Sequence, residues 1–297
     1  MKKIKVFDAH TDILYDCYQS SLKGDISRFN DYHYNQLNHH ITGGIWTVYS
    51  PNEFNLFEAL EVSKSLVDLD QFEVILGIEG LRNLKDVSEL ERIYQLGYRH
   101  AMLTWNEANQ YATGVNGPKD QGLTQHGYEV LDFMIENDMI IDLSHLNEKS
   151  FYDVLNYTSK NILVSHSNLA KLMDHKRNLT DDQLKKLKEA NGLLCLTAVG
   201  NFIAIDESDK NLDTWMKHLE EAIKIMGIDN VGFGFDFMDY FGPTKTMNLE
   251  ELKNASEVGA LLKKLAENGY SKEDIEKLTY YNIYNRFSRH IYKQSNQ

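Results

Sequence analysis

Six side chains that could bind metal ions or carry protons follow short apolar runs in this sequence. They are His10, Asp12, Glu79, His145, His166 and Asp236. His10 and Asp12 lie two residues apart, so in an extended segment both side chains project to the same face. The other four end runs of their own, in ILGIEG, IIDLSH, ILVSH and VGFGFDF. These residues can act together only if the fold brings the ends of the runs to one place.

Imidazoles and carboxylates gathered in one buried place need a cation, because the carboxylates would otherwise repel one another and be poorly solvated. Three histidines with two carboxylates suit zinc or a similar first-row ion better than magnesium, which prefers oxygen ligands. Five ligands fit two ions if one carboxylate bridges them at about 3.5 to 4 Å. A water shared by both ions would become hydroxide near neutral pH, and Asp236 would take and return its proton.

Eight apolar or β-branched runs, each followed by an amphipathic segment, must position these residues. The runs are Ile4–Asp8, Gly44–Tyr49, Glu73–Ile78, His100–Trp105, Met139–Leu143, Ile162–Ser165, Leu193–Ala198 and Val231–Phe235. Alternating strands and helices imply parallel strands with right-handed crossovers. Eight such units predict an α/β fold of the (β/α)8 TIM-type barrel, in which catalytic groups lie at the C-terminal ends of the strands. An open doubly wound sheet is the alternative that the pattern allows.

Several helix boundaries can be predicted from capping signals. A helix is expected over Ser88–Leu96, and another after Thr180, where TDDQLKKLKEANG places two acidic residues in the first turn. SKED at Ser271–Asp274 is typical of a capping box before a further helix. Met238–Glu257 is expected to be a long loop that leads into a helix.

No break in composition or internal repeat divides the chain, so residues 1–297 are predicted to form one catalytic domain.

The composition argues against two classes of partner. The 31 Lys and Arg residues against 44 Asp and Glu give a net charge of -13, which repels nucleic acid and anionic membranes. No apolar stretch approaches the roughly 18 to 20 residues of a membrane-spanning helix, and MKKIK runs into the first strand without a signal-peptide apolar region. Cys17 and Cys195 lie among apolar residues and are expected to be reduced. These features favour a cytoplasmic protein.

The motifs and their order resemble one known family. The segments DAHTD, GIEG, YQLGYRHAMLTWNEAN, GLTQHG, IDLSH, VSHS, HKRNLTDD, GFDF and YYNIYNRF resemble the membrane (renal-type) dipeptidases, peptidase family M19. This family comprises binuclear zinc peptidases related to the amidohydrolase barrels. The resemblance implies that His10, Asp12 and Glu79 bind one Zn²⁺, and that Glu79 bridges to a second Zn²⁺ held by His145 and His166. It also makes Asp236 the catalytic aspartate.

The resemblance implies substrate contacts as well. Arg177, in KRN, falls on the arginine that contacts the terminal carboxylate of the substrate, and a fork of N–H donors suits a carboxylate. The chain departs from the family at Trp105, in LTWNEAN, where the renal enzyme has a histidine thought to stabilise the tetrahedral oxyanion. The second metal ion, the Trp105 indole N–H or Asn106 could act instead, or Trp105 could simply pack against the pocket. His175 is expected near the pocket beside Arg177.

These observations predict a zinc-dependent dipeptidase that acts on L-L and also L-D dipeptides. An N-acyl amino acid or lactone hydrolase on the same binuclear barrel is the second hypothesis, and Arg177 separates the two because a lactone has no terminal carboxylate. A non-catalytic scaffold with vestigial ligands is the third hypothesis, against which the five intact ligand positions argue. Relatives tend to dimerise, so a homodimer is also considered, although no segment of the chain indicates a self-complementary surface.

Overall fold

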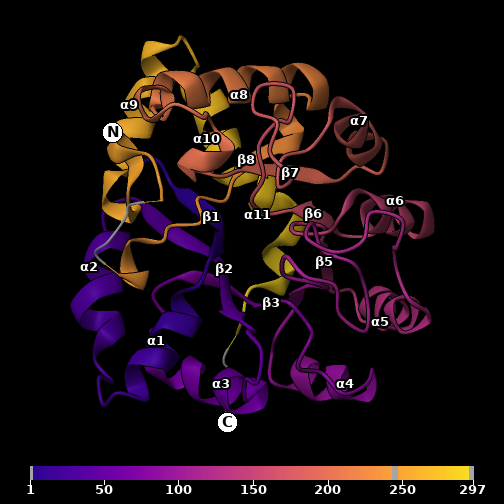
Figure 1. Ribbon diagram of the computed structural model, residues 1–297. Coiled ribbons are helices and arrows are strands. Elements are labelled where there is room, and N and C mark those ends of the chain that lie inside the picture. Colours follow the sequence, from indigo (N-terminus) through magenta and orange to yellow (C-terminus); the bar gives the residue numbers. More distant parts are fainter. Residues whose placement is uncertain (1–2, 243–246, 294–297) are drawn as a thin grey trace.

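The computed structural model describes residues 3–242 and 247–293, and eight parallel strands within them pair in chain order. The strands are β1 (Val6–Thr11), β2 (Ile41–Tyr49), β3 (Glu73–Glu79), β4 (His100–Met102), β5 (Ile140–Asp142), β6 (Ile162–Val164), β7 (Leu193–Leu196) and β8 (Val231–Phe233). Helices surround this sheet (Figure 1). The strand order confirms the predicted (β/α)8 TIM-type barrel. It excludes the doubly wound sheet, in which the strand order does not follow the chain.

Each predicted run overlaps one strand, although β4, β7 and β8 end two or three residues earlier than expected. The ranges of β1 and β2 differ in a way that matters for the site. β1 extends to Thr11, so His10 lies inside the strand and not beyond it. Pairing continues there because Thr11 is still in register with Trp46 of β2. β2 begins at Ile41, and Gly43 fits inside the sheet because a Cβ at that position would lie 2.2 Å from the carbonyl oxygen of Glu73.

The barrel nearly closes where β1 meets β8. Oδ1 of the buried Asp8 accepts hydrogen bonds from the backbone N–H groups of Phe235, at 2.9 Å, and His10, at 3.2 Å. The backbone N–H of Asp236 donates to the carbonyl oxygen of His10 at 3.3 Å. The end of β8 is therefore tied to the end of β1, which places Asp236 beside His10.

The helices follow the strands as expected. They are α1 (Ile13–Ser21), α2 (Tyr34–Leu37), α3 (Leu56–Ser63), α4 (Ser88–Gln95), α5 (Gln125–Glu136), α6 (Glu148–Tyr157), α7 (Asp181–Glu189), α8 (Leu212–Met226), α9 (Val258–Glu267), α10 (Lys272–Glu276) and α11 (Asn282–Phe287). Thr180 and Ser271 form the predicted capping boxes of α7 and α10. The predicted loop over Met238–Glu257 contains short 3₁₀ turns and leads into α9, although residues 243–246 lie outside the described part.

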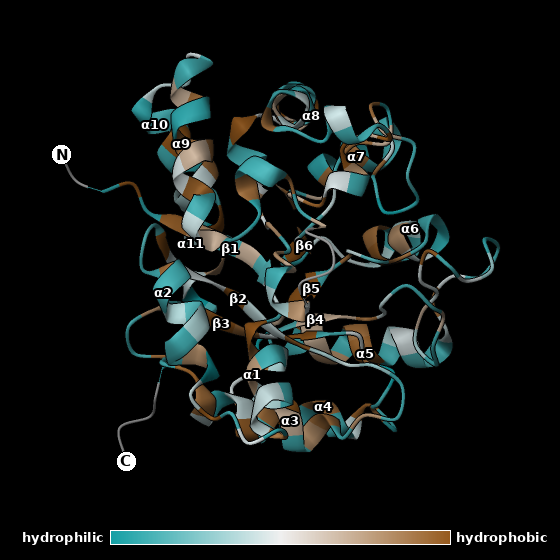
Figure 2. Cartoon of the chain, turned by 60° about the vertical axis from the view of Figure 1, so that its left-hand side comes forward, coloured by the Kyte–Doolittle hydropathy of each residue, from teal (hydrophilic) through white to brown (hydrophobic). Residues whose placement is uncertain are grey.

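The core has two parts, one between strands and helices and one inside the barrel. Apolar residues concentrate on the strands and on the helix faces that pack against them (Figure 2). Ile283 and Phe287 of α11 pack with Leu193 of β7 in the inner cluster. The Tyr280 hydroxyl donates to Glu73, the first residue of β3, at 2.7 Å. The C-terminal segment thus covers the end of the barrel at which the strands begin, and the opposite end is left for a site. None of the helices in the described ranges has the length and apolar character needed to cross a bilayer.

Candidate active site

Side chains that end β1, β3, β5, β6 and β8 converge at the C-terminal end of the barrel. One group of close potential ligand atoms comes from His10, Glu79 and His166, and another comes from His10, Asp12 and Asp236, with the atoms of each group within 4.8 Å of one another. His145 joins the first group, because its Nε2 lies 2.8 Å from Glu79 Oε1 and 2.9 Å from His166 Nε2. The structure therefore brings together all six residues that the sequence singled out as ligands or proton carriers.

His10 lies at the centre of these groups. Its Nε2 lies 3.8 Å from Asp12 Oδ2, 3.8 Å from Glu79 Oε1 and 3.6 Å from Asp236 Oδ1. The ring is fully buried, and neither of its nitrogens has a hydrogen-bond partner in the described part of the chain. A buried polar atom without a partner is costly. An imidazole nitrogen that faces three carboxylates in this way fits a divalent metal ion, which supplies both the missing partner and the countercharge.

Burial shifts the titration of the cluster in a consistent way. It raises the pKa of Asp12 to about 7 and that of Asp236 to about 6, where the charge of Arg177 partly offsets the effect. It raises the pKa of Glu79 well above its ordinary value, and the nearby charge of Asp12 adds to this. Burial lowers the pKa of His10 to about 3. The fold thus disfavours both charged carboxylates and charged imidazoles here, and a bound cation would reverse the first effect.

Two of the converging residues have unusual backbone conformations. His145 and Asp236 have φ angles of 71° and 55°, in the left-handed region that non-glycine residues seldom adopt. Both residues lie three residues after the end of a strand, at β5 and β8. Asn248 holds the second turn, because its Nδ2 donates to the carbonyl oxygen of Asp236 at 2.9 Å. Such strain, of order 1–3 kcal/mol per residue, is characteristic of functional sites. At His145 and Asp236, the left-handed conformation directs both side chains into the barrel mouth.

Hydrogen bonds from neighbouring side chains fix the orientation of three of the converging groups. Nδ1 of His145 lies 2.9 Å from Asn106 Oδ1, and Nδ1 of His166 lies 2.8 Å from Ser165 Oγ. The hydroxyl of Thr47 donates to Asp12 Oδ1 at 2.6 Å. Each histidine is thereby held with Nε2 toward Glu79.

The roles of Ser165 and Thr47 were not predicted from the sequence. A hydroxyl directly before a candidate ligand, as in ILVSH, was the one signal available for Ser165. Thr47 lies in β2, which carries no candidate ligand, and its contact with Asp12 depends on the pairing of β2 with β1.

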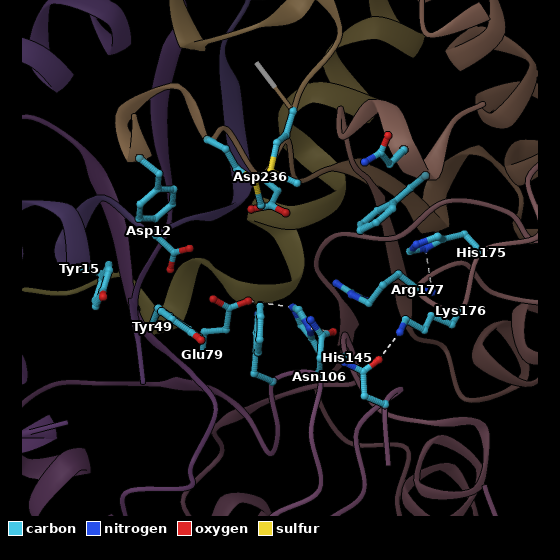
Figure 3. Close-up of a pocket in the computed structure, with 17 residues that line it drawn as sticks. Asp12, Tyr15, Tyr49, Glu79, Asn106, His145, His175, Lys176, Arg177 and Asp236 are labelled. Carbon is cyan, nitrogen blue, oxygen red and sulfur yellow. Dashed lines mark hydrogen bonds and ion pairs between the residues drawn. The ribbon is translucent and has the colours of Figure 1, made fainter. Parts of the chain in front are cut away.

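A cavity of about 590 Å³ opens above the converging groups, a size typical of small-molecule sites. Arg177, Lys176 and His175 lie on one side of it, and Tyr15 and Tyr49 lie on the other (Figure 3). The positions of Arg177 and His175 agree with the sequence-based expectation. Arg177 is buried, and its Nη2 donates to the carbonyl oxygen of His166 at 3.3 Å. Burial lowers the pKa of Arg177 to about 10, so its guanidinium still carries a charge at neutral pH.

Trp105 and Asn106, the two other residues predicted to contact substrate, line the same cavity. The Trp105 ring lies between those of Tyr49 and His145, at centroid distances of 5.3 Å and 6.0 Å. Gly80, with a φ of 90°, allows this approach, because a Cβ there would lie 3.2 Å from the Trp105 backbone nitrogen. The indole N–H has no hydrogen-bond partner among the described residues. Trp105 therefore packs against the pocket, and its indole N–H can also donate a hydrogen bond to a substrate.

Comparison with curated proteins finds relatives at moderate identity. A Klebsiella pneumoniae protein described by its place in the 5′ region of pqqA is 32% identical over 203 residues, which are 65% of this chain and 73% of that protein. An uncharacterised dipeptidase of Schizosaccharomyces pombe is 34% identical over 55% of this chain, and dipeptidase aclJ of Aspergillus oryzae is 31% identical over 70%. The matched regions span 41% and 49% of these two relatives, respectively.

Solved structures share the fold over almost the whole chain. A metallopeptidase of family M19 described as dipeptidase AC superposes with a TM-score of 0.82 at 21% identity, covering 98% of this chain and 99% of that one. A metallopeptidase from Rhodobacter sphaeroides bound to a phosphinate mimic of L-Ala-D-Ala gives 0.81 at 20% identity, covering 98% and 100%. The model of the membrane dipeptidase family, peptidase family M19, matches residues 51–296. This chain therefore belongs to the membrane dipeptidase family of metallopeptidases.

Proposed function

We propose that this chain hydrolyses the amide bond of dipeptides at a pair of divalent metal ions, and that both ions are zinc. His10, Asp12 and Glu79 would hold one ion, and Glu79, His145 and His166 the other. The observation that carries the proposal is the position of Glu79 Oε1, which lies 2.8 Å from His145 Nε2 and 3.8 Å from Nε2 of both His10 and His166. Imidazole with carboxylate is a donor set that zinc accepts.

Bound zinc would lower the pKa of a coordinated water to near neutrality and polarise the amide carbonyl. The remaining steps fall to side chains of the chain itself. Asp236 Oδ1 lies 3.6 Å from His10 Nε2, so a carboxylate that can take up and return a proton stands beside the metal ligands. We assign it the transfer of a proton to the leaving amine.

Arg177 would bind the C-terminal carboxylate of the dipeptide. It is a buried cation at the cavity edge, with a single side-chain hydrogen bond to the described residues, so most of its donors remain for a substrate. Asn106 uses Oδ1 to orient His145 and keeps the N–H donors of its Nδ2 amide, so this amide and the indole N–H of Trp105 are both side-chain donors for the developing oxyanion. The phosphinate mimic of L-Ala-D-Ala bound by the Rhodobacter sphaeroides protein supports the inclusion of L-D dipeptides.

Metal analysis followed by a panel of L-L and L-D dipeptides tests the proposal. We expect two zinc ions per chain and hydrolysis of at least part of the panel by the zinc-loaded protein. A preparation that holds both ions and cleaves no dipeptide would contradict it. Parallel assays with an N-acyl amino acid and a lactone address the alternative hydrolase, which would cleave these compounds and leave dipeptides intact.

Two further predictions concern the cellular location and the oligomeric state of the protein. We propose a cytoplasmic location, which the buried free thiols of Cys17 and Cys195 support, because free cysteines persist in reducing compartments. A homodimer stays a prediction, and sedimentation of the purified protein would test it.

A further inference from the structure

We infer that this cavity selects dipeptides whose N-terminal residue carries a large apolar side chain. The selecting surface is an aromatic wall made of Tyr15, Tyr49, Trp105 and Phe241, all of which line the cavity. This inference rests on the proposed dipeptidase function and adds the substrate class to it.

The wall is continuous from the cavity mouth to the converging ligands. Its rings follow one another, with centroid distances of 6.1 Å from Phe241 to Tyr15, 5.4 Å from Tyr15 to Tyr49 and 5.3 Å from Tyr49 to Trp105. The centroid of the Trp105 ring lies 6.0 Å from that of the His145 ring. Ring separations of this size are typical of packed aromatic pairs, so the wall is preformed.

Rigid elements hold the two inner tyrosines. Tyr15 lies in the first turn of α1, three residues after Asp12, and Tyr49 ends β2 in register with Glu79 of β3. Tyr15 therefore lies one helical turn after the candidate ligand Asp12, and Tyr49 lies beside the candidate ligand Glu79 on the neighbouring strand. An N-terminal side chain against these rings would keep the scissile amide next to Asp12 and Glu79.

The direction of the substrate follows from the charges of the cavity. The cations Arg177 and Lys176 lie on the side opposite Tyr15 and Tyr49, with Glu79 and Asp236 between the two sides (Figure 3). A dipeptide whose C-terminal carboxylate meets Arg177 therefore presents its amide to the central groups and its N-terminal residue to the aromatic wall.

The chemistry of the wall favours an apolar occupant. Its four side chains are neutral at neutral pH, so an acidic substrate side chain would find no countercharge there. An aromatic or large aliphatic side chain would gain stacking and the burial of apolar area against the rings. A cationic side chain is the competing occupant, because aromatic faces attract cations.

A panel that varies only the N-terminal residue tests the inference. We expect kcat/KM for Phe-Ala to exceed that for Ala-Ala by about tenfold or more, with Asp-Ala lowest and Lys-Ala below Phe-Ala. The reversed peptide Ala-Phe should show no such gain over Ala-Ala. Equal rates for Phe-Ala and Ala-Ala, or a faster rate for Lys-Ala than for Phe-Ala, would overturn the inference. Absence of any cleavage by the metal-loaded protein would instead count against the proposed function.

Variants assign the preference to the wall. Tyr15→Ala should lower the ratio of kcat/KM for Phe-Ala over Ala-Ala by about tenfold, whereas Tyr15→Phe should keep the ratio. Phe241→Ala removes an exposed ring at the cavity mouth, and its effect on the same ratio tests the assignment if Tyr15→Ala does not fold. Met247→Ala is the matched control, because Met247 lines the cavity beside the 200–202 turn that follows β7 and should leave the ratio unchanged. An unchanged ratio in both wall variants would contradict the assignment.

Discussion

Glu79 and His145 meet at the barrel mouth, with Oε1 of the carboxylate 2.8 Å from Nε2 of the imidazole. Glu79 ends β3 and His145 follows β5, so the whole of β4 separates their strands in the sheet. The same Oε1 lies 3.8 Å from Nε2 of both His10 and His166. One carboxylate oxygen therefore faces three imidazoles from three other strands, which supports the proposal that both metal ions would share Glu79.

Glu79→Gln tests this bridge. The amide keeps the shape of the side chain but has no charge to share between two cations. We expect the zinc content to fall from two ions to one or fewer, and kcat/KM to fall by more than about 100-fold. Elemental analysis of the purified variant, with circular dichroism as the check on folding, measures the first effect. A folded variant that retains two ions would show that Glu79 does not bridge.

The metal-free protein should lose stability as the pH rises from about 6.5 to 8. Burial raises the pKa of Asp8 to about 8 and that of Asp12 to about 7, so the folded chain keeps protons that the unfolded chain has already lost. The unfolded state then binds fewer protons, and the free energy of unfolding falls with pH until both groups are ionised. Below about 6.5 the neutral buried His10 opposes this trend, since its unfolded form gains a proton there.

Urea unfolding of the chelator-treated protein across this pH range measures the effect. Zinc should weaken the dependence, because a cation beside Asp12 stabilises its charged form. Asp8→Asn should weaken it as well, since an amide at this position does not titrate. A metal-free protein equally stable at pH 6.5 and pH 8 would contradict the burial argument.

The barrel and the convergence of the candidate ligands could be predicted from the sequence, because each ligand directly follows an apolar run and parallel strands end at one rim. Residues that act through others could not be predicted in this way. Thr47 contacts Asp12 because β2 is the neighbour of β1, and Ser165 contacts the ring of the next residue, His166, in a side-chain conformation that the sequence does not display. The cavity-facing positions of Tyr15 and Tyr49 likewise follow from the first turn of α1 and the register of β2, which no local pattern displays.

Arg177→Met separates a dipeptidase from a lactone hydrolase. Methionine fills the buried space but cannot pair with a carboxylate, so we expect kcat/KM for dipeptides to fall by about 10- to 150-fold, equivalent to roughly 1.5 to 3 kcal/mol. Lys176→Met is the matched control, since this neighbouring cation is exposed and should cost less than tenfold. Dipeptide hydrolysis that survives Arg177→Met unchanged would argue that the substrate has no carboxylate at this position.

Ser165→Ala tests whether the hydrogen bond behind His166 supports metal binding. Ser165 Oγ lies 2.8 Å from Nδ1 of His166, and its loss would free the ring to rotate away from Glu79. We expect the affinity for one of the two zinc ions to weaken by about 10- to 100-fold, measured by competition with a chromophoric chelator. Ser167→Ala is the matched control, because Ser167 is equally buried and its Oγ has no hydrogen-bond partner among the described residues. If both variants bind zinc as tightly as the parent chain, the hydroxyl of Ser165 does not position the ligand. If both weaken it equally, the effect reflects packing around β6 and not the hydrogen bond to His166.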